Sequence, residues 1–195
     1  MKQRGFKVGR RFLALVAVSL GVMTAGLFAG TTTASAKATI TPSYAFFPTK
    51  TITYNISTSS KYYRGVWKKA VKAWSKNGTL KFKATTKKKA MMRLGAARHL
   101  NYKEPGNFRF QSKTIMNTET GETLKVFTKV DGKLDMDYLA KQKLSRTKKV
   151  ALAVRLMGFM VGLDNSTNGK SVMGDYHTSL AKVDKQGVAY AYRLV

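Results

Sequence analysis

The segment from Val150 to Met173 reads VALAVRLMGFMVGLDNSTNGKSVM and decides the fold that we expect for this chain. Its first fourteen residues, Val150–Leu163, carry a single charge, at Arg155. A run this short and apolar predicts a buried core helix, because a helix that spans a bilayer needs about 20 apolar residues. Apolar content alone does not explain the residues after it, which read Gly-Leu-Asp-x-Ser and then Ser-Val-Met.

The segment contains two glycines followed by two short runs at defined distances from them. These residues are Gly158, Gly162, Leu163, Asp164, Ser166, Ser171, Val172 and Met173. That spacing resembles the active-site helix and Met-turn of the metzincin zinc proteases, such as the matrixins, whose helix carries His-Glu-x-x-His-x-x-Gly-x-x-His. Trp67 and Trp74 on an earlier amphipathic helix and the segment Asp184–Tyr192 extend the resemblance. It covers most of the chain after about residue 50.

The chemical residues of the metzincin pattern are all substituted. With the family's glycine on Gly162, the three zinc-ligand positions fall on Arg155, Phe159 and Asn165, and the general-base position falls on Leu156. We refer to these last four as the motif positions. The family needs three imidazoles to hold zinc and a glutamate to take a proton from zinc-bound water. Arg155 has no acceptor, Phe159 and Leu156 have no lone pair, and Asn165 offers one weak oxygen. The resemblance therefore implies a pseudoprotease without zinc or catalysis.

Arg155 raises a further hypothesis about the substituted site. Its guanidinium could stand in the vacated metal space as a fixed cation that pairs with Asp164, Asp175 or a bound carboxylate. The alternative is that the side chain reaches from the helix into water. His99 and His177 are the only histidines and stand far apart in sequence, so we expect two unrelated surface residues and no metal site.

Residues 1–36 have the features of a secretory signal peptide. A basic start is followed by an uncharged, mostly apolar run from Phe12 to Gly30, and Ala34-Ser35-Ala36 supplies a cleavage signature. The run is nearly long enough to span a bilayer, so an uncleaved anchor stays open as an alternative. Cleavage leaves 195 − 36 = 159 residues, which is one domain. The chain has no cysteine, which favours a secreted, extracellular bacterial protein, with association to the cell wall left open.

The mature chain is strongly basic. Of the 36 basic residues five lie in the signal peptide, so the remainder carries 31 − 9 = +22 charges and is expected to contact polyanions. Teichoic acids, anionic lipid headgroups and released nucleic acid are the candidates outside a bacterial cell. No nucleic-acid motif is present, which argues against sequence-specific binding. Membrane contact is expected only through the signal peptide or weak electrostatics. The candidate anion-binding residues are Lys68, Lys72, Lys81, Lys83, Lys87, Lys88 and Lys89.

The order of the expected elements predicts an α+β fold. Residues 37–50, polar with two prolines, are expected as a lead-in segment before a domain at 51–195. The resemblance implies a metzincin-like (zincin-like) domain: a twisted mixed sheet of about five strands with three helices. The expected strands are 51–56, 80–84, 91–96, 108–116 and 123–130, and the expected helices are 61–76, about 146–163 and 179–194. Residues 135–144 are expected as a short helix or coil, and Asp131-Gly132 as a hairpin turn.

Three functions follow from these patterns. The first is a catalytically inactive, secreted pseudo-metalloprotease that binds a protein or peptide in its cleft, or an anionic cell-envelope polymer. The second is an active zinc metalloendopeptidase, as the family resemblance alone implies. The third is a cationic wall- or membrane-binding protein whose protease-like stretch is accidental.

Overall fold

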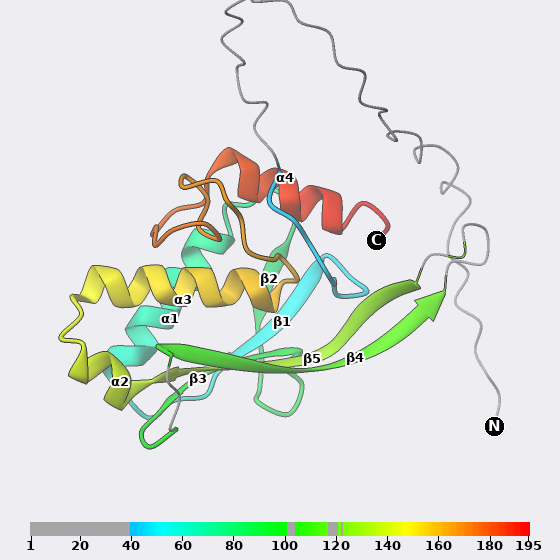
Figure 1. The fold of residues 1–195 in the computed structure, drawn as a ribbon. Coiled ribbons are helices and arrows are strands. Elements are labelled where there is room, and N and C mark those ends of the chain that lie inside the picture. Colours follow the sequence, from blue (N-terminus) through cyan, green and yellow to red (C-terminus); the bar gives the residue numbers. More distant parts are fainter. Residues whose placement is uncertain (1–39, 101–103, 117–120, 122) are drawn as a thin grey trace, which may run out of the picture. The chain divides into compact units, whose positions relative to one another are not determined.

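The computed structural model describes residues 40–100, 104–116, 121 and 123–195, so the expected signal peptide lies outside the described residues. The described part is an α+β domain with a five-stranded mixed sheet (Figure 1). Its strands are β1 (Thr51–Ile56), β2 (Lys81–Ala84), β3 (Met92–Ala97), β4 (Gly106–Met116) and β5 (Thr123–Asp135). Its helices are α1 (Lys61–Trp74), α2 (Met136–Lys141), α3 (Arg146–Met160) and α4 (Lys182–Ala191). Within this described part, no helix has the length and apolar content needed to cross a membrane.

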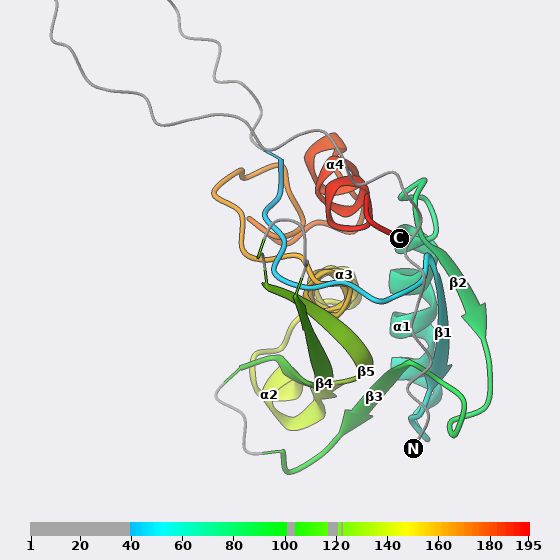
Figure 2. The same cartoon turned by 90° about the vertical axis from the view of Figure 1, so that its right-hand side faces the viewer.

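The sheet has the strand order β2-β1-β3-β5-β4. The first four strands are parallel, and β4 runs antiparallel to β5 at one edge. The strands curve around α1 and α3, which pack side by side against one face (Figure 2). Alternate strand residues are buried beneath these helices: Ile52, Met92, Leu94, Val130 and Leu134. The prediction of an α+β domain with a mixed sheet of five strands is therefore confirmed.

Helix α1 begins at Lys61, as its sequence predicts, and ends at Trp74, two residues before the predicted end. The Ser60 side chain accepts a hydrogen bond from the Tyr63 amide at 3.4 Å, which satisfies one of the free amides of the first turn. After the helix, Asn77 accepts from the Leu80 amide at 2.6 Å, and Gly78 takes a φ of 85°. The apolar stripe of the helix, which includes Trp67 and Trp74, is buried, while its lysines face solvent.

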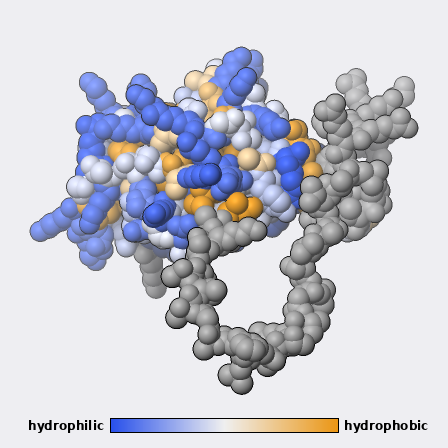
Figure 3. Space-filling view, turned by 90° about the horizontal axis from the view of Figure 1, so that it is seen from above, coloured by the Kyte–Doolittle hydropathy of each residue, from blue (hydrophilic) through white to orange (hydrophobic). Residues whose placement is uncertain are grey.

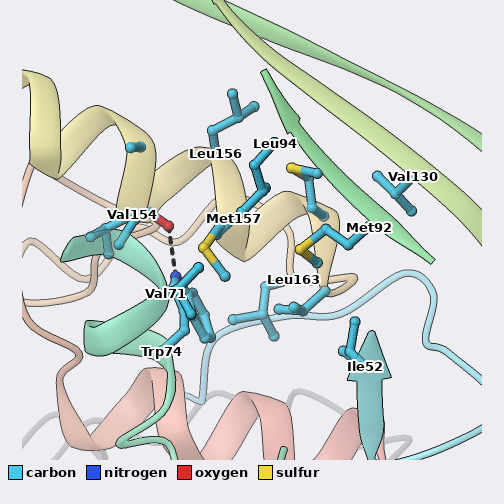
Figure 4. Close-up of a cluster of buried hydrophobic side chains, with 14 of the residues drawn as sticks. Ile52, Val71, Trp74, Met92, Leu94, Val130, Val154, Leu156, Met157 and Leu163 are labelled. Atoms are coloured by element: carbon cyan, nitrogen blue, oxygen red, sulfur yellow. Dashed lines mark hydrogen bonds between the residues drawn. The ribbon is translucent and has the colours of Figure 1, made fainter. Parts of the chain in front are cut away.

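Helix α3 is the central helix of the core. Its N-cap is Ser145, and nine of its fifteen residues are buried. The Trp74 indole of α1 donates a hydrogen bond to the Val154 carbonyl of α3 at 2.8 Å (Figure 4). A second indole, that of Trp67, donates to the Gly95 carbonyl of β3 at 2.9 Å. These two bonds satisfy the polar atoms of the largest buried side chains and fix α1 between α3 and the sheet.

Residues 40–47 belong to the core of the domain. The sequence predicts them as part of a polar lead-in, but Phe47 is fully buried and its amide donates to the Tyr192 hydroxyl at 3.2 Å. Ser43 forms an isolated bridge with Leu163, and Phe46 forms one with Val126. The folded domain in the structure thus includes this segment.

The predicted hairpin turn at Asp131-Gly132 is wrong, because both residues lie inside β5. Asp131 forms an ion pair with Arg93 of the neighbouring strand β3. A Cβ on Gly132 would collide with the sulfur of Met160, so the glycine makes room for α3 against the sheet. Close packing, and not a turn, explains the glycine.

The helices also differ from the prediction in number and length. Four helices are present in the described residues instead of three, because Asp135 caps a short helix, α2, by accepting hydrogen bonds from the Asp137 and Tyr138 amides, each at 3.0 Å. The last helix, α4, is shorter than expected at both ends. Its start is set by Asp184, which accepts from the Ala181 amide at 2.9 Å.

Candidate functional site

The motif positions come together at the C-terminal end of α3. The helix ends at Met160, and Gly162 follows with a φ of 96°, a conformation that side chains rarely adopt. A Cβ on Gly162 would collide with the Ala45 carbonyl. The turn at this glycine carries the chain back along the helix, so that Arg155 donates a hydrogen bond to the side-chain oxygen of Asn165 at 2.8 Å.

A cleft of about 430 Å³ lies beside this hydrogen bond. All four motif positions line it, together with further residues of α3, of β4 and β5, and of two connections: Leu152, Gly106, Leu134, Glu104, Pro105 and Tyr176. Helix α3 forms one wall and the start of the edge strand β4 forms another, since Leu156 packs against Gly106. Residues that the sequence alignment to the metzincin pattern places at a single site therefore do share one cleft.

The guanidinium of Arg155 is held between two aromatic rings. Its central carbon lies 5.6 Å from the ring centre of Phe159 and 5.7 Å from that of Tyr176. Phe159 in turn stacks on Phe108 of β4, with ring centres 5.9 Å apart and planes 7° apart. These cation–π contacts and the bond to Asn165 fix the direction of the charge. The side chain is half-buried, so it does not simply extend into water.

Arg155 forms no ion pair with Asp164 or Asp175, contrary to one of our expectations. Within the part of the chain that the structure describes, no carboxylate oxygen lies within 4.0 Å of its guanidinium. Asp164 instead accepts from the Asn165 amide at 2.7 Å, and Asp175 from the Tyr176 amide.

The segment Ser171-Val172-Met173 packs against α3 and is fully buried. The Met173 sulfur lies where a Cβ of Gly158 would be, so the glycine lets the segment approach the helix. The segment is fixed by Asp184 of α4, a fully buried carboxylate that accepts from the Ser171 hydroxyl and from the Val172 amide at 3.1 Å.

The donor atoms at the motif positions do not fit zinc. A guanidinium is a permanent cation, and benzyl and isobutyl side chains have no lone pair. The remaining oxygen, on Asn165, already accepts the hydrogen bond from Arg155. His99 lies beside Asp137 at 3.2 Å, and His177 contacts the Gly169 carbonyl at 2.7 Å. No group of three histidine, cysteine or acidic residues capable of holding a metal is found among the described residues.

Tyr44 contacts the C-terminal end of α3 at Phe159, one of the residues that line the cleft. Its hydroxyl donates to the Phe159 carbonyl at 2.9 Å, at the end of α3 where carbonyls lack helical partners. Burial, with a smaller contribution from the charge of Asp164, raises the pKa of Tyr44 well above its ordinary value. The phenol therefore stays neutral and keeps donating at physiological pH.

The candidate anion-binding lysines lie in three places. Lys81 and Lys83 are exposed on β2, the second edge strand, and Lys87–Lys89 are exposed in the connection to β3. Lys68 and Lys72 are exposed on the solvent side of α1. Only three contacts between opposite charges occur in the described residues, and none of them involves a lysine. Hydrophilic side chains cover most of the face in Figure 3, with hydrophobic residues in separate spots.

Tyr176 and the residues around the start of β4 are the parts of the site that the sequence did not identify. Tyr176 is an exposed aromatic residue, at 56%, within an otherwise polar connection, and this mismatch is the signal that could have found it. Glu104 and Gly106 gave no such signal, because only the sheet brings them to α3. No family model matches the chain, and no curated protein matches it significantly.

Proposed function

We propose that the protein is a secreted, non-catalytic pseudoprotease of metzincin-like fold that binds a peptide in the cleft beside α3. The observation that carries this function is the guanidinium of Arg155, which is held by Asn165 between two rings at the positions where a metzincin holds zinc. A preorganised cation can bind a substrate group, but it cannot activate water as a metal does.

The cleft favours a ligand that carries a carboxylate next to an apolar group. A guanidinium has five N–H donors, and the bond to Asn165 uses one of them. A carboxylate can accept two of the remaining donors in a fork geometry. Leu134, Leu152 and Leu156 supply the apolar wall. An acidic residue beside an aliphatic one, or the C-terminus of a peptide ending in an aliphatic residue, has this chemistry.

Binding at the cell envelope is part of the same proposal. It is supported by the signal-peptide features of residues 1–36, the absence of cysteine and the basic mature chain. The sequence-level alternative of a zinc metalloendopeptidase needs donors that the motif positions do not supply.

A peptide-binding experiment with two arginine variants tests the function. The probe is a peptide array that pairs each Glu-Leu sequence with its Gln-Leu counterpart. A charge-assisted hydrogen-bond pair is worth about 1.5–3 kcal/mol, so Arg155→Ala should lower the affinity for the acidic peptides by roughly 10- to 100-fold. Arg155→Lys should restore only part of this, because an ammonium lacks the planar fork.

Arg193→Ala is the matched control, since Arg193 is an exposed arginine that stacks on Tyr190 at 3.7 Å away from the cleft. It should leave peptide binding unchanged. The purified protein, supplied with zinc, should retain no stoichiometric metal and cleave no peptide. Chelator-sensitive peptidase activity, or equal losses in the two alanine variants, would overturn the proposed function.

A further inference from the structure

The face of the sheet opposite α1 and α3 carries no helix in the described structure (Figures 1 and 2). Four of its five strands are parallel, and parallel sheets occur almost only with both faces covered. The residues on this second face are polar and reach solvent, as the exposed Lys81, Lys83 and Lys133 show. We call this surface the outer sheet face.

Basic residues occupy the outer sheet face on four of its five strands. The register places Asn55 of β1 beside Arg93 of β3, then Asp131 of β5, then Arg109 of β4. The basic residues at the outward-facing positions are Lys81, Lys83, Arg93, Arg109, Lys129 and Lys133. Asp131 is the one acidic side chain among these described positions that faces outward, and it is already paired with Arg93. The other five positive charges of this face, on Lys81, Lys83, Arg109, Lys129 and Lys133, therefore remain available to a ligand.

The densest lysine cluster of the sequence is fixed beside this surface. The connection from β2 to β3 crosses β1 and is held there by two outward-facing side chains of that strand. The Thr53 hydroxyl donates to the Lys89 carbonyl at 3.2 Å, and the Asn55 amide donates to the Thr85 carbonyl at 2.8 Å. Lys87, Lys88 and Lys89 are all exposed. These bonds place three further cations next to Lys81 and Lys83.

We propose that the outer sheet face, with the Lys87–Lys89 connection, binds a linear polyphosphodiester whose repeating units carry no aromatic group, such as a glycerol phosphate polymer. Adjacent strands are about 4.8 Å apart, so a chain laid across the five strands meets cations over about 19 Å. Such a ligand supplies the negative charge that this face lacks, and it covers the open side of a parallel sheet.

The side chains of the same face disfavour two other polyanions. Single-stranded nucleic acid is bound through aromatic residues that stack on the bases, and no aromatic residue stands at the described outward-facing positions. Interfacial membrane binding uses apolar side chains that insert between lipids. The exposed large hydrophobic residues in the described chain are Tyr62, Phe110, Ile115, Met116, Tyr176 and Tyr190, and none of them is at these positions.

Two variants that each lose four charges test this surface on the full-length protein. The first is Lys81→Gln/Lys83→Gln/Lys129→Gln/Lys133→Gln, on the sheet. The second changes exposed lysines of α1 and α4 that are not among the candidate anion-binding residues, as Lys61→Gln/Lys69→Gln/Lys182→Gln/Lys185→Gln. A glycerol phosphate polymer is the probe, and its affinity is measured by titration at several salt concentrations. Seven of these eight lysines are exposed and Lys129 is half-buried, so both variants should fold, and thermal unfolding checks this.

The sheet variant should weaken polymer binding at least about tenfold, and the helix variant less than about twofold. If about five phosphates are neutralised, the logarithmic salt slope of the unmodified protein is about −3.5, and affinity falls about 100-fold between 50 and 200 mM salt. The slope of the sheet variant should be shallower by about 2 to 3. Replacing the same four lysines by arginine should preserve binding.

Three outcomes would overturn the assignment. Equal losses in the two glutamine variants would mean that the charge acts globally and no defined surface exists. Tighter binding of DNA than of the polymer, at equal phosphate concentration, would assign a nucleic acid instead. Binding to vesicles of anionic phospholipid that exceeds binding to the polymer, and that the sheet variant abolishes, would assign a membrane surface. None of these outcomes depends on Arg155, so the cleft and the outer sheet face are tested independently.

Discussion

Removing the carboxylate of Asp184 should destabilise the domain more than any other single change to its acidic residues. Asp184 is fully buried, and its side chain accepts four hydrogen bonds from three separate segments. These donors are the hydroxyls of Thr41 and Ser171 and the amides of Val172 and Ala181. One carboxylate thus joins the segment at 40–47, the buried segment 171–173 and the start of α4.

The cost of Asp184→Ala follows from what happens to these four donors. The hydroxyl oxygens of Thr41 and Ser171 lie 3.2 Å apart, so these two groups can still form a hydrogen bond with each other once the carboxylate is removed. The Val172 and Ala181 amides lose their side-chain acceptor, and a buried amide without a partner costs about 1–3 kcal/mol. With the cavity left by the side chain, we expect a loss of about 4 kcal/mol. Asp184→Asn keeps one oxygen for both amides and should cost about 1–2 kcal/mol.

Urea unfolding followed by tryptophan fluorescence measures these losses, since Trp67 and Trp74 are both buried in the core. Asp175→Ala is the control, because Asp175 is exposed, and it should change stability by less than about 0.5 kcal/mol. A loss below about 1 kcal/mol for Asp184→Ala would show that the three segments do not depend on this carboxylate.

Three further changes test other parts of the structure. Gly162→Ala should lower the free energy of unfolding by more than about 2 kcal/mol, because the glycine has a φ of 96° and faces the Ala45 carbonyl. Gly169 lies in open space, so Gly169→Ala should leave the free energy of unfolding unchanged in the same assay. Burial raises the pKa of the Tyr192 phenol above its unfolded value of about 10. Its contribution to stability is therefore complete below a pH of about 10 and is lost as the pH rises further. Tyr192→Phe should show a smaller loss of stability between about pH 9 and pH 11 than the unmodified protein, as measured by denaturant titration. Placing His, Glu, His and His at the motif positions, in chain order, should create a zinc site detectable by metal titration, and a folded variant that binds no zinc would show that the backbone differs from a metzincin site.

Local patterns predicted the parts of the fold that depend on local chemistry. Ser60 caps the start of α1, which was predictable because capping is a contact between near neighbours in sequence. The four-residue spacing of Arg155 and Phe159 predicts that they share a face of α3, and both do line the cleft. The same local reasoning failed at Asp131-Gly132, because the space that Gly132 leaves is filled by a residue of another element.

Contacts between distant segments could not be predicted from the sequence. The Phe47 amide meets the Tyr192 hydroxyl across 145 positions, and no periodicity or spacing in the segment 37–50 indicates this partner. Tyr176 and Glu104 reach the cleft from two connections that the sheet and α3 bring together. Such positions are determined by the tertiary fold. The motif positions of the site were therefore predictable from the sequence, but the residues that other segments contribute to the cleft were not.

Four of the residues that carry the resemblance to metzincins have packing or hydrogen-bonding roles in this structure. Gly158 admits the Met173 sulfur, Gly162 admits the Ala45 carbonyl, and Ser171 bonds to Asp184. Each of these contacts holds one segment of the domain against another and requires no bound metal. The spacing of these residues therefore bears on the fold, whereas only the motif positions bear on the chemistry. None of these contacts involves a motif position, so the cleft can serve a binding function without a change in this packing.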